Sequence, residues 1–132
     1  MSSADQLHGI HVLQSVRARG EEHPALYAAA LLHDAGKSCH RPRLWDRVIV
    51  VLGTAMLPDA VERWGKGSPG GWRRPFVIAA QHPLWGAEMI RTAGGSQELE
   101  TLVRRHQETP PRRVETEIDR LLLVLHEADG EN

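Results

Sequence analysis

The sequence predicts an all-α fold, arranged as one compact bundle of about six to seven helices. Apolar residues recur at spacings of three and four, as in the stripe formed by Leu99, Leu102, Val103 and His106. No segment shows the alternation of apolar and polar residues that is typical of a half-buried strand, and no internal repeat is present. A chain of 132 residues suits one hydrophobic core, so we expect a single domain over residues 1–132.

Composition and charge exclude several classes of function. The net charge of −1 offers no basic surface for a polyanion, so we expect no stable nucleic-acid binding. One cysteine, Cys39, excludes an internal disulfide, and without a signal-peptide pattern it predicts a cytoplasmic protein. No apolar stretch approaches the roughly 20 residues of a membrane span. Eight histidines, against one Phe and one Tyr, prompt a search for a metal site.

The first two helices are marked by residues that begin and end helices. Ser2 or Ser3 can cap a first helix that ends near Gly20. Pro24 suits the first turn of a second helix, which we expect to run to about Gly36. The side chains of this second helix are small and apolar on nearly every side, so the helix should be buried in the domain.

The middle of the chain should form a third helix and a loop. We expect this helix from Arg43 to about Leu57, followed after Pro58 by a short helical segment to Trp64. Residues 65–71 are rich in glycine and should form a surface excursion or, alternatively, a lid. The residues expected to point inward from the third helix are Leu44, Val48, Val51 and Leu52.

The remaining segments predict four more helical stretches. A short helix is expected from Phe76 to Gln81, and another should begin at His82-Pro83 and end before Gly94-Gly95. Ser96 should cap the next helix, and a last helix should cover about Val114 to Ala128. The last helix should bury Ile118, Leu121, Leu122 and Leu125, and Asp129 continues this stripe.

Six potential metal ligands lie on or beside the inward stripes of these helices: His8, His33, Asp34, His82, His106 and Asp129. One inward histidine is ordinarily a hydrogen-bonded core residue, but such coincidences on five helices favour a metal site in a bundle. Six ligands suit two ions with a bridging carboxylate, for which Asp34 is the natural candidate. Nitrogen and oxygen ligation without thiolate favours two divalent transition metal ions, Fe or Mn, with Zn, Ni or Co as alternatives.

The sequence resembles the HD-domain superfamily of metal-dependent phosphohydrolases. The resemblance rests on the run LLHDAGK at residues 31–37, the upstream His8 and the late Asp129, and His82 and His106 match the two-metal subset. Residues 82–90, HPLWGAEMI, also resemble a segment of the HD-GYP cyclic di-GMP phosphodiesterases. However, Gln107 replaces the second histidine of a pair and the Gly-Tyr-Pro motif is missing, so a generic small HD phosphohydrolase is the closer match.

The resemblance also implies roles for particular residues. His8, His33, Asp34 and Asp129 would hold one ion, and Asp34, His82 and His106 would hold the second. A metal-bridging hydroxide would attack a phosphoester or phosphoanhydride of a small, nucleotide-like substrate. Asp34 and Lys37 would be the catalytic residues, with Lys37 binding a substrate phosphate or orienting a water. Alternatively, Lys37 is a lysine favoured by the dipole at a helix C-terminus.

Arginines near these motifs are candidates for substrate binding. Arg41, Arg43, Arg47 and Arg105 could bind phosphate through the guanidinium fork, or could be ordinary solvated charges. Two other functions stay open. One is a di-iron oxygenase of the HD fold with the same ligand set, and the other is a regulatory HD domain without catalysis. The sequence leaves the oligomeric state open, and an oligomer is compatible with it.

Overall fold

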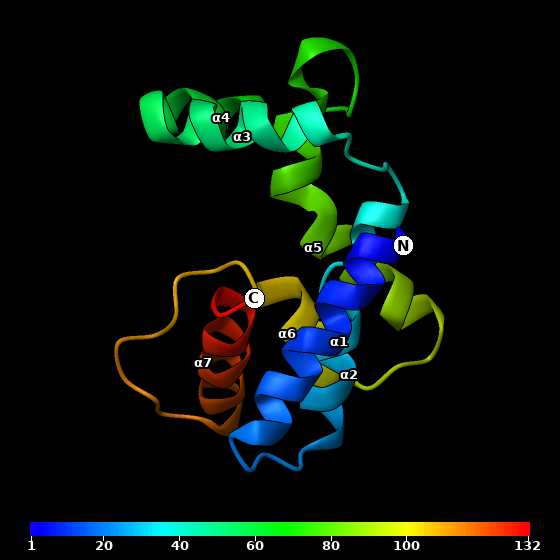
Figure 1. The fold of residues 1–132 in the computed structure, drawn as a ribbon, viewed down its shortest axis with the longest axis vertical. Helices are drawn as coiled ribbons and strands as arrows, with labels where there is room; N and C mark the ends of the chain where they lie inside the picture. Colours follow the sequence, from blue (N-terminus) through cyan, green and yellow to red (C-terminus); the bar gives the residue numbers. More distant parts are fainter.

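The computed structural model describes residues 1–132, and every regular element in it is helical (Figure 1). This confirms the predicted all-α class and the number of helices. No helix combines the length and hydropathy that a membrane span requires. The elements, including two short 3₁₀ helices η1 and η2, are α1 (Ser3–Ala18), α2 (Pro24–Leu32), η1 (Ala35–Ser38), α3 (Leu44–Met56), α4 (Pro58–Trp64), η2 (Gly71–Arg73), α5 (Arg74–Thr92), α6 (Gln97–Arg105) and α7 (Glu117–Gly130).

The helix ends follow the capping residues that the sequence shows. The Ser2 side chain accepts a hydrogen bond from the Asp5 backbone N–H, and Ser96 does the same for Leu99, so these two serines begin α1 and α6. Gly20 and Gly94 follow the ends of α1 and α5, each with φ of 79°. Glycine adopts this left-handed conformation without the steric cost that other residues meet.

The main core lies among α1, α2, α6, α7 and the C-terminal part of α5 (Figure 1). The inward positions predicted on α6 and α7 are confirmed, although Ile118 is only partly buried. The His-Asp pair follows α2, and residues 33–36 are buried. The twelve residues of the core are Val12, Val16, Leu26, Ala29, Ala30, Ile90, Leu102, Val103, Leu121, Leu122, Leu125 and Ala128.

Helix α3 does not pack as the sequence predicted. The expected inward residues Leu44, Val48, Val51 and Leu52 are exposed, and no residue of α3 is buried. The side that meets α5 is the one with Gly53, where an added Cβ would lie 2.9 Å from the Phe76 ring. Because α3 is apolar on most sides, its periodicity could not indicate which side would be covered. Figure 1 shows α3 and α4 at one end of the molecule, away from α1, α2, α6 and α7.

Helix α5 also differs from the prediction, because it is one helix where two were expected. Its 19 residues run through Pro83 without a break. A proline inside a helix removes one backbone hydrogen bond. Packing outweighs this loss, since Phe76, Val77 and Ile78 before Pro83 and Ala87 after it are all buried. His82 therefore lies in the middle of a buried helix and not at a helix start.

Candidate metal centre

His33 and Asp34 lie in the turn between α2 and η1. The helix expected to reach Gly36 ends at Leu32 because Asp34 leaves the helical region, with φ of −93° and ψ of 4°. The His33 backbone N–H still donates to the last turn of α2, so the buried helix sets the position of the imidazole. At Asp34 the backbone turns away from the axis of α2.

Gly36 brings this turn onto the backbone of α5. A Cβ added at Gly36 would lie 1.8 Å from the His82 carbonyl oxygen and 2.7 Å from the Gly86 nitrogen. Only a residue without a side chain permits such an approach of two backbones. The approach places Asp34 beside His82, so the conformation of the LLHDAGK run and the formation of the site depend on the same glycine.

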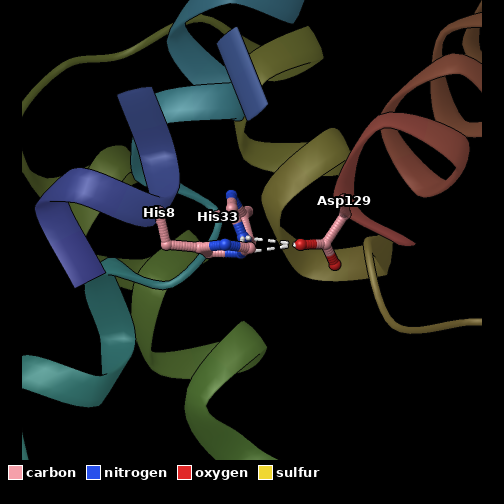
Figure 2. A group of neighbouring side chains, drawn as sticks. All are labelled: His8, His33 and Asp129. Atoms are coloured by element: carbon pink, nitrogen blue, oxygen red, sulfur yellow. Dashed lines mark hydrogen bonds and ion pairs between the residues drawn. The ribbon is translucent and has the colours of Figure 1, made fainter. Parts of the chain in front are cut away.

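The first cluster joins the two ends of the chain (Figure 2). His8 on α1 and Asp129 on α7 are separated by 2.8 Å between Nε2 and Oδ1. His33 Nε2 lies 3.3 Å from His8 Nε2 and 3.4 Å from Asp129 Oδ1. These three side chains form one of two groups whose ligand atoms lie close enough to hold a metal ion.

The second cluster consists of Asp34, His82 and His106, which are all buried. Asp34 Oδ1 lies 3.1 Å from His82 Nε2 and 3.9 Å from His106 Nε2. His33 Nε2 is 3.8 Å from the other oxygen of Asp34, so the His-Asp pair connects the two clusters. The carboxylate of Asp34 lies between them, as a bridging group would.

Three of the imidazoles are oriented by backbone carbonyls of their own helices. The Nδ1 atoms of His33, His82 and His106 lie 3.0, 3.0 and 2.7 Å from the carbonyl oxygens of Ala30, Ile78 and Val103. Each Nδ1 must carry a proton to make this bond, so Nε2 faces the centre and offers a lone pair whenever the ring is neutral. This arrangement is typical of histidines that bind a metal through Nε2.

No positively charged group lies between the Nε2 atoms of His82 and His106 and the Oδ1 atom of Asp34 in the second cluster. The Nε2 atoms of His82 and His106 are buried and have no hydrogen-bond partner. His82 Nε2 lies 3.1 Å from a carboxylate oxygen of Asp34, so these two atoms must share either a proton or a cation. Burying polar groups without a partner is costly, and a cation coordinated by all three groups removes that cost. The residues present therefore fit a divalent metal ion.

The electrostatics of the site favour the protonation states that metal binding requires. Burial raises the pKa of the Asp34 carboxyl, but His82 and the charges of Lys37 and His33 outweigh it and hold the pKa far below its ordinary value. Burial, with the charges of His33 and His82, lowers the pKa of His106 to about 4. A charged carboxylate and a neutral imidazole are the forms that bind metals.

In the first cluster the carboxylates retain a proton on an imidazole. Burial lowers the pKa of His33, but Asp129 and Asp34 outweigh it and raise the pKa above its ordinary value. Burial raises the pKa of Asp129, and the bonds and charges of His33 and His8 reverse that and lower it. A divalent ion at this position would supply the positive charge that the two carboxylates now draw from His33.

A cavity of about 230 Å³ lies beside the second cluster. Lys37 and His82 line its inner side, and Lys37 Nζ donates to Asp34 Oδ2 at 2.6 Å. Arg47 and Asp46 from α3 also line the cavity, with Asp46 paired to Arg74, together with apolar side chains such as Val50 and Ile78. The cavity therefore combines two cations with an apolar wall, next to the clustered histidines.

The comparison with known families agrees with this geometry. A family model described as the HD domain matches residues 8–131, from the first histidine of the site to beyond its last aspartate. The chain belongs to the HD domain family. No curated protein and no solved structure matches it. Members of the HD family are mostly metal-dependent phosphohydrolases, and the buried His and Asp groups described above could hold metal ions.

The HD domain brings together all six residues that the sequence indicated as metal ligands. Lys37 and Arg47 both line the cavity, but the other predicted phosphate-binding arginines, Arg41, Arg43 and Arg105, do not. Arg105 pairs with Glu108 at 2.8 Å between Nε and Oε2, while Arg41 and Arg43 are exposed. Their roles remain predictions from the sequence.

Sequence reasoning named Arg47 as a candidate phosphate ligand but missed Asp5 as its partner near the site. Arg47 Nη2 donates to Asp5 Oδ1 at 3.1 Å, and the carboxyl of Asp5 is buried at the start of α1. Burial raises the pKa of Asp5, but hydrogen bonds from Ser2 and the charges of Lys37 and Arg47 lower it overall. The capping pattern identified Asp5 only as a helix start, because nothing in the sequence indicated that α3 would reach it.

Proposed function

We propose that this HD domain is a hydrolase that uses two divalent metal ions to cleave a phosphoester or phosphoanhydride of a small substrate. The observation that carries the proposal is the adjacency of two features. The Asp34, His82 and His106 cluster, with its unpartnered Nε2 atoms, adjoins a cavity that contains the cations Lys37 and Arg47. Metal ions held by these ligands would supply chemistry at phosphorus, and cations that can hydrogen-bond to a phosphate select an anionic substrate.

In this proposal the side chains of the chain share the work of binding and hydrolysis. His8, His33, Asp34 and Asp129 would hold one ion, and Asp34, His82 and His106 the other. When bound, such ions supply a nucleophilic water at neutral pH and offset the charge of the phosphoryl group. Hydrolysis joins the water oxygen to phosphorus, breaks the bond to the leaving group and returns a proton to the leaving oxygen.

Lys37 and Arg47 would position the phosphate. The Lys37 ammonium already donates to Asp34, so it lies where it can also donate to a phosphate oxygen or help orient the water. Arg47 is held in place by the buried Asp5 carboxylate, which reduces the freedom that its guanidinium would lose on binding.

The size of the cavity limits the part of the substrate that enters it. At about 230 Å³ it is smaller than the roughly 300–1,000 Å³ of most small-molecule sites. It suits a phosphoryl group with a small attached fragment, so the base of a nucleotide would extend beyond the rim. We therefore expect small phosphate esters to compete effectively with nucleotides.

The test combines metal analysis with a hydrolysis assay. Purified protein loaded with Mn or Fe should contain two ions per chain and release phosphate from a panel of nucleotides and small phosphate esters. Asp34→Ala should abolish both. Arg47→Ala should raise KM, while Arg91→Ala, which alters an exposed arginine paired with Glu88, should not.

Three results would overturn the proposal. Hydrolysis that survives Asp34→Ala unchanged would exclude the metal cluster as its source. Oxygen uptake by the iron-loaded protein with a candidate substrate, without phosphate release, would instead support the oxygenase alternative. A protein with no affinity for transition metals would support the regulatory alternative.

A further inference from the structure

The outer face of α3 is covered by large apolar side chains that nothing in the chain covers. Their exposed fractions range from 37% for Val48 to 76% for Leu44. Trp45 and Met56, which a single domain would normally bury in part, are exposed by 73% and 75%. We call this surface the α3 face, and its members are Leu44, Trp45, Val48, Ile49, Val51, Leu52 and Met56.

The α3 face carries no charge. At 3.6 residues per turn its side chains cover about 160° of the helix circumference. The two charged residues of α3 lie outside this arc and bind within the chain. Asp46 Oδ2 lies 2.8 Å from Arg74 Nη1, and Arg47 binds Asp5. The face could therefore meet an identical face without bringing like charges together.

The area of the face matches what one partner contributes to a stable interface. The exposed fractions of the seven side chains correspond to roughly 900 Å² of surface. An interface of standard size buries a similar area, about 800 Å², on each partner. The largest apolar patch of a monomeric protein measures roughly 300–600 Å². The α3 face therefore exceeds what a monomer ordinarily exposes.

A lipid surface is a poorer match for this helix. Helices that lie in a membrane interface carry lysine and arginine along their polar face. The opposite side of α3 has only Asp46 and Arg47, and both are engaged inside the chain. In addition, the two ends of α3 are flanked by both signs of charge, with Arg43 before α3 and Asp59 in the first turn of α4.

We propose that the α3 face binds a second copy of this chain, with the two α3 helices antiparallel about a two-fold axis. This arrangement buries the seven apolar side chains of both copies against each other. It also places Arg43 at the start of one α3 next to Asp59 beyond the end of the other. Mixed charge beside the ends of α3 thus fixes the orientation, and the uncharged centre supplies the affinity.

Dimerisation would act on the cavity through α3. Arg47, Val50 and Val51 of this helix line the cavity, and Val51 also belongs to the α3 face. A partner seated on the face would hold α3 in position. The part of the cavity wall that α3 forms would then depend on the second copy.

Sedimentation velocity of the full chain at protein concentrations between about 1 and 100 μM tests the proposal. Specific assemblies have Kd values within or below this range. Wild type should sediment as a dimer at the higher concentrations. Leu52→Glu should raise the dimer Kd at least tenfold. The matched control is Leu84→Glu, which alters an exposed leucine of α5 outside the face and should leave the dimer intact.

A charge exchange beside the ends of α3 makes the test independent of any folding defect in Leu52→Glu. Arg43→Glu should weaken the dimer, and adding Asp59→Arg should restore it. A wild-type monomer at the highest concentration would overturn the proposal, and its cosedimentation with anionic vesicles would assign the face to lipid. A Leu52→Glu protein that dimerises as tightly as wild type would also overturn it, as would a charge exchange without effect.

Discussion

Replacing Gly36 by alanine should damage both the stability and the metal site, because this glycine allows η1 to lie on α5. The added methyl would start 1.8 Å from the His82 carbonyl oxygen, whereas an ordinary contact begins at 3.4 Å. The two backbones must therefore separate by about 1.6 Å, which is well beyond the small shifts that cores absorb. Both obstructing atoms belong to backbone, so no side chain can rotate away.

The expected loss can be estimated from this displacement. Overpacking a core typically costs about 1–3 kcal/mol, and the backbone clash places Gly36→Ala at the upper end. For a chain of this length, about 3 kcal/mol corresponds to a fall in Tm of roughly 10 °C. The separation also moves Asp34 away from His82. A misplacement of about 1 Å can cost on the order of 100-fold in rate, so kcat/KM should fall at least that far.

Thermal unfolding followed by circular dichroism, with metal analysis on the same sample, measures both effects. Gly70→Ala is the matched control, because a Cβ there meets nothing within 4 Å and the residue has φ of −134°. The control should unfold at the wild-type temperature and retain its metal. A Gly36→Ala protein with wild-type Tm and metal content would refute this account of the contact.

Three further predictions concern the residues around the site. His106→Ala should remove one metal equivalent per chain, while His126→Ala, an exposed change on α7, should remove none in the same analysis. Asp5→Asn should lower the free energy of unfolding by about 1 kcal/mol at pH 7, as the loss of a helix cap does. The fold lowers the pKa of Asp5, so this contribution to stability is present above pH 3.8, the ordinary pKa of the carboxyl, and is lost as the pH falls through the folded pKa. Urea titrations at several pH values measure this change in the free energy of unfolding. Chelation should lower the Tm by roughly 10 °C in a thermal scan, since an ion present at about 100 times its Kd contributes about 2.7 kcal/mol to stability.

The helical elements could be predicted because their signals are local. Ser2, Ser96, Gly20 and Gly94 act through hydrogen bonds and backbone angles within a few residues, and the structure confirms each of them. The clustering of six histidines and aspartates could also be predicted, since every ligand lies on or beside an inward stripe. Bundle geometry then leaves few places for such side chains to meet.

Other features depended on contacts between distant parts of the chain. The stripe Leu44, Val48, Val51 and Leu52 is periodic, but the packing of Gly53 on Phe76 decides which side of α3 is covered. Burial on both sides of Pro83 carries α5 through a residue that usually ends a helix. The cavity and the pairing of Arg47 with Asp5 follow from the position of α3, so local patterns could not predict them.

The separation of the two clusters along the chain has a consequence for the order in which the domain assembles. The last residue of the Asp34, His82 and His106 group emerges 23 residues before Asp129, which completes the other group. Helices α2, α5 and α6 can therefore gather one set of ligands without any residue of α7. The site with His8 closes only when the first and seventh helices meet. We expect the ion of the Asp34, His82 and His106 group to bind first. The ion of the other group should bind only after α1 and α7 have packed together.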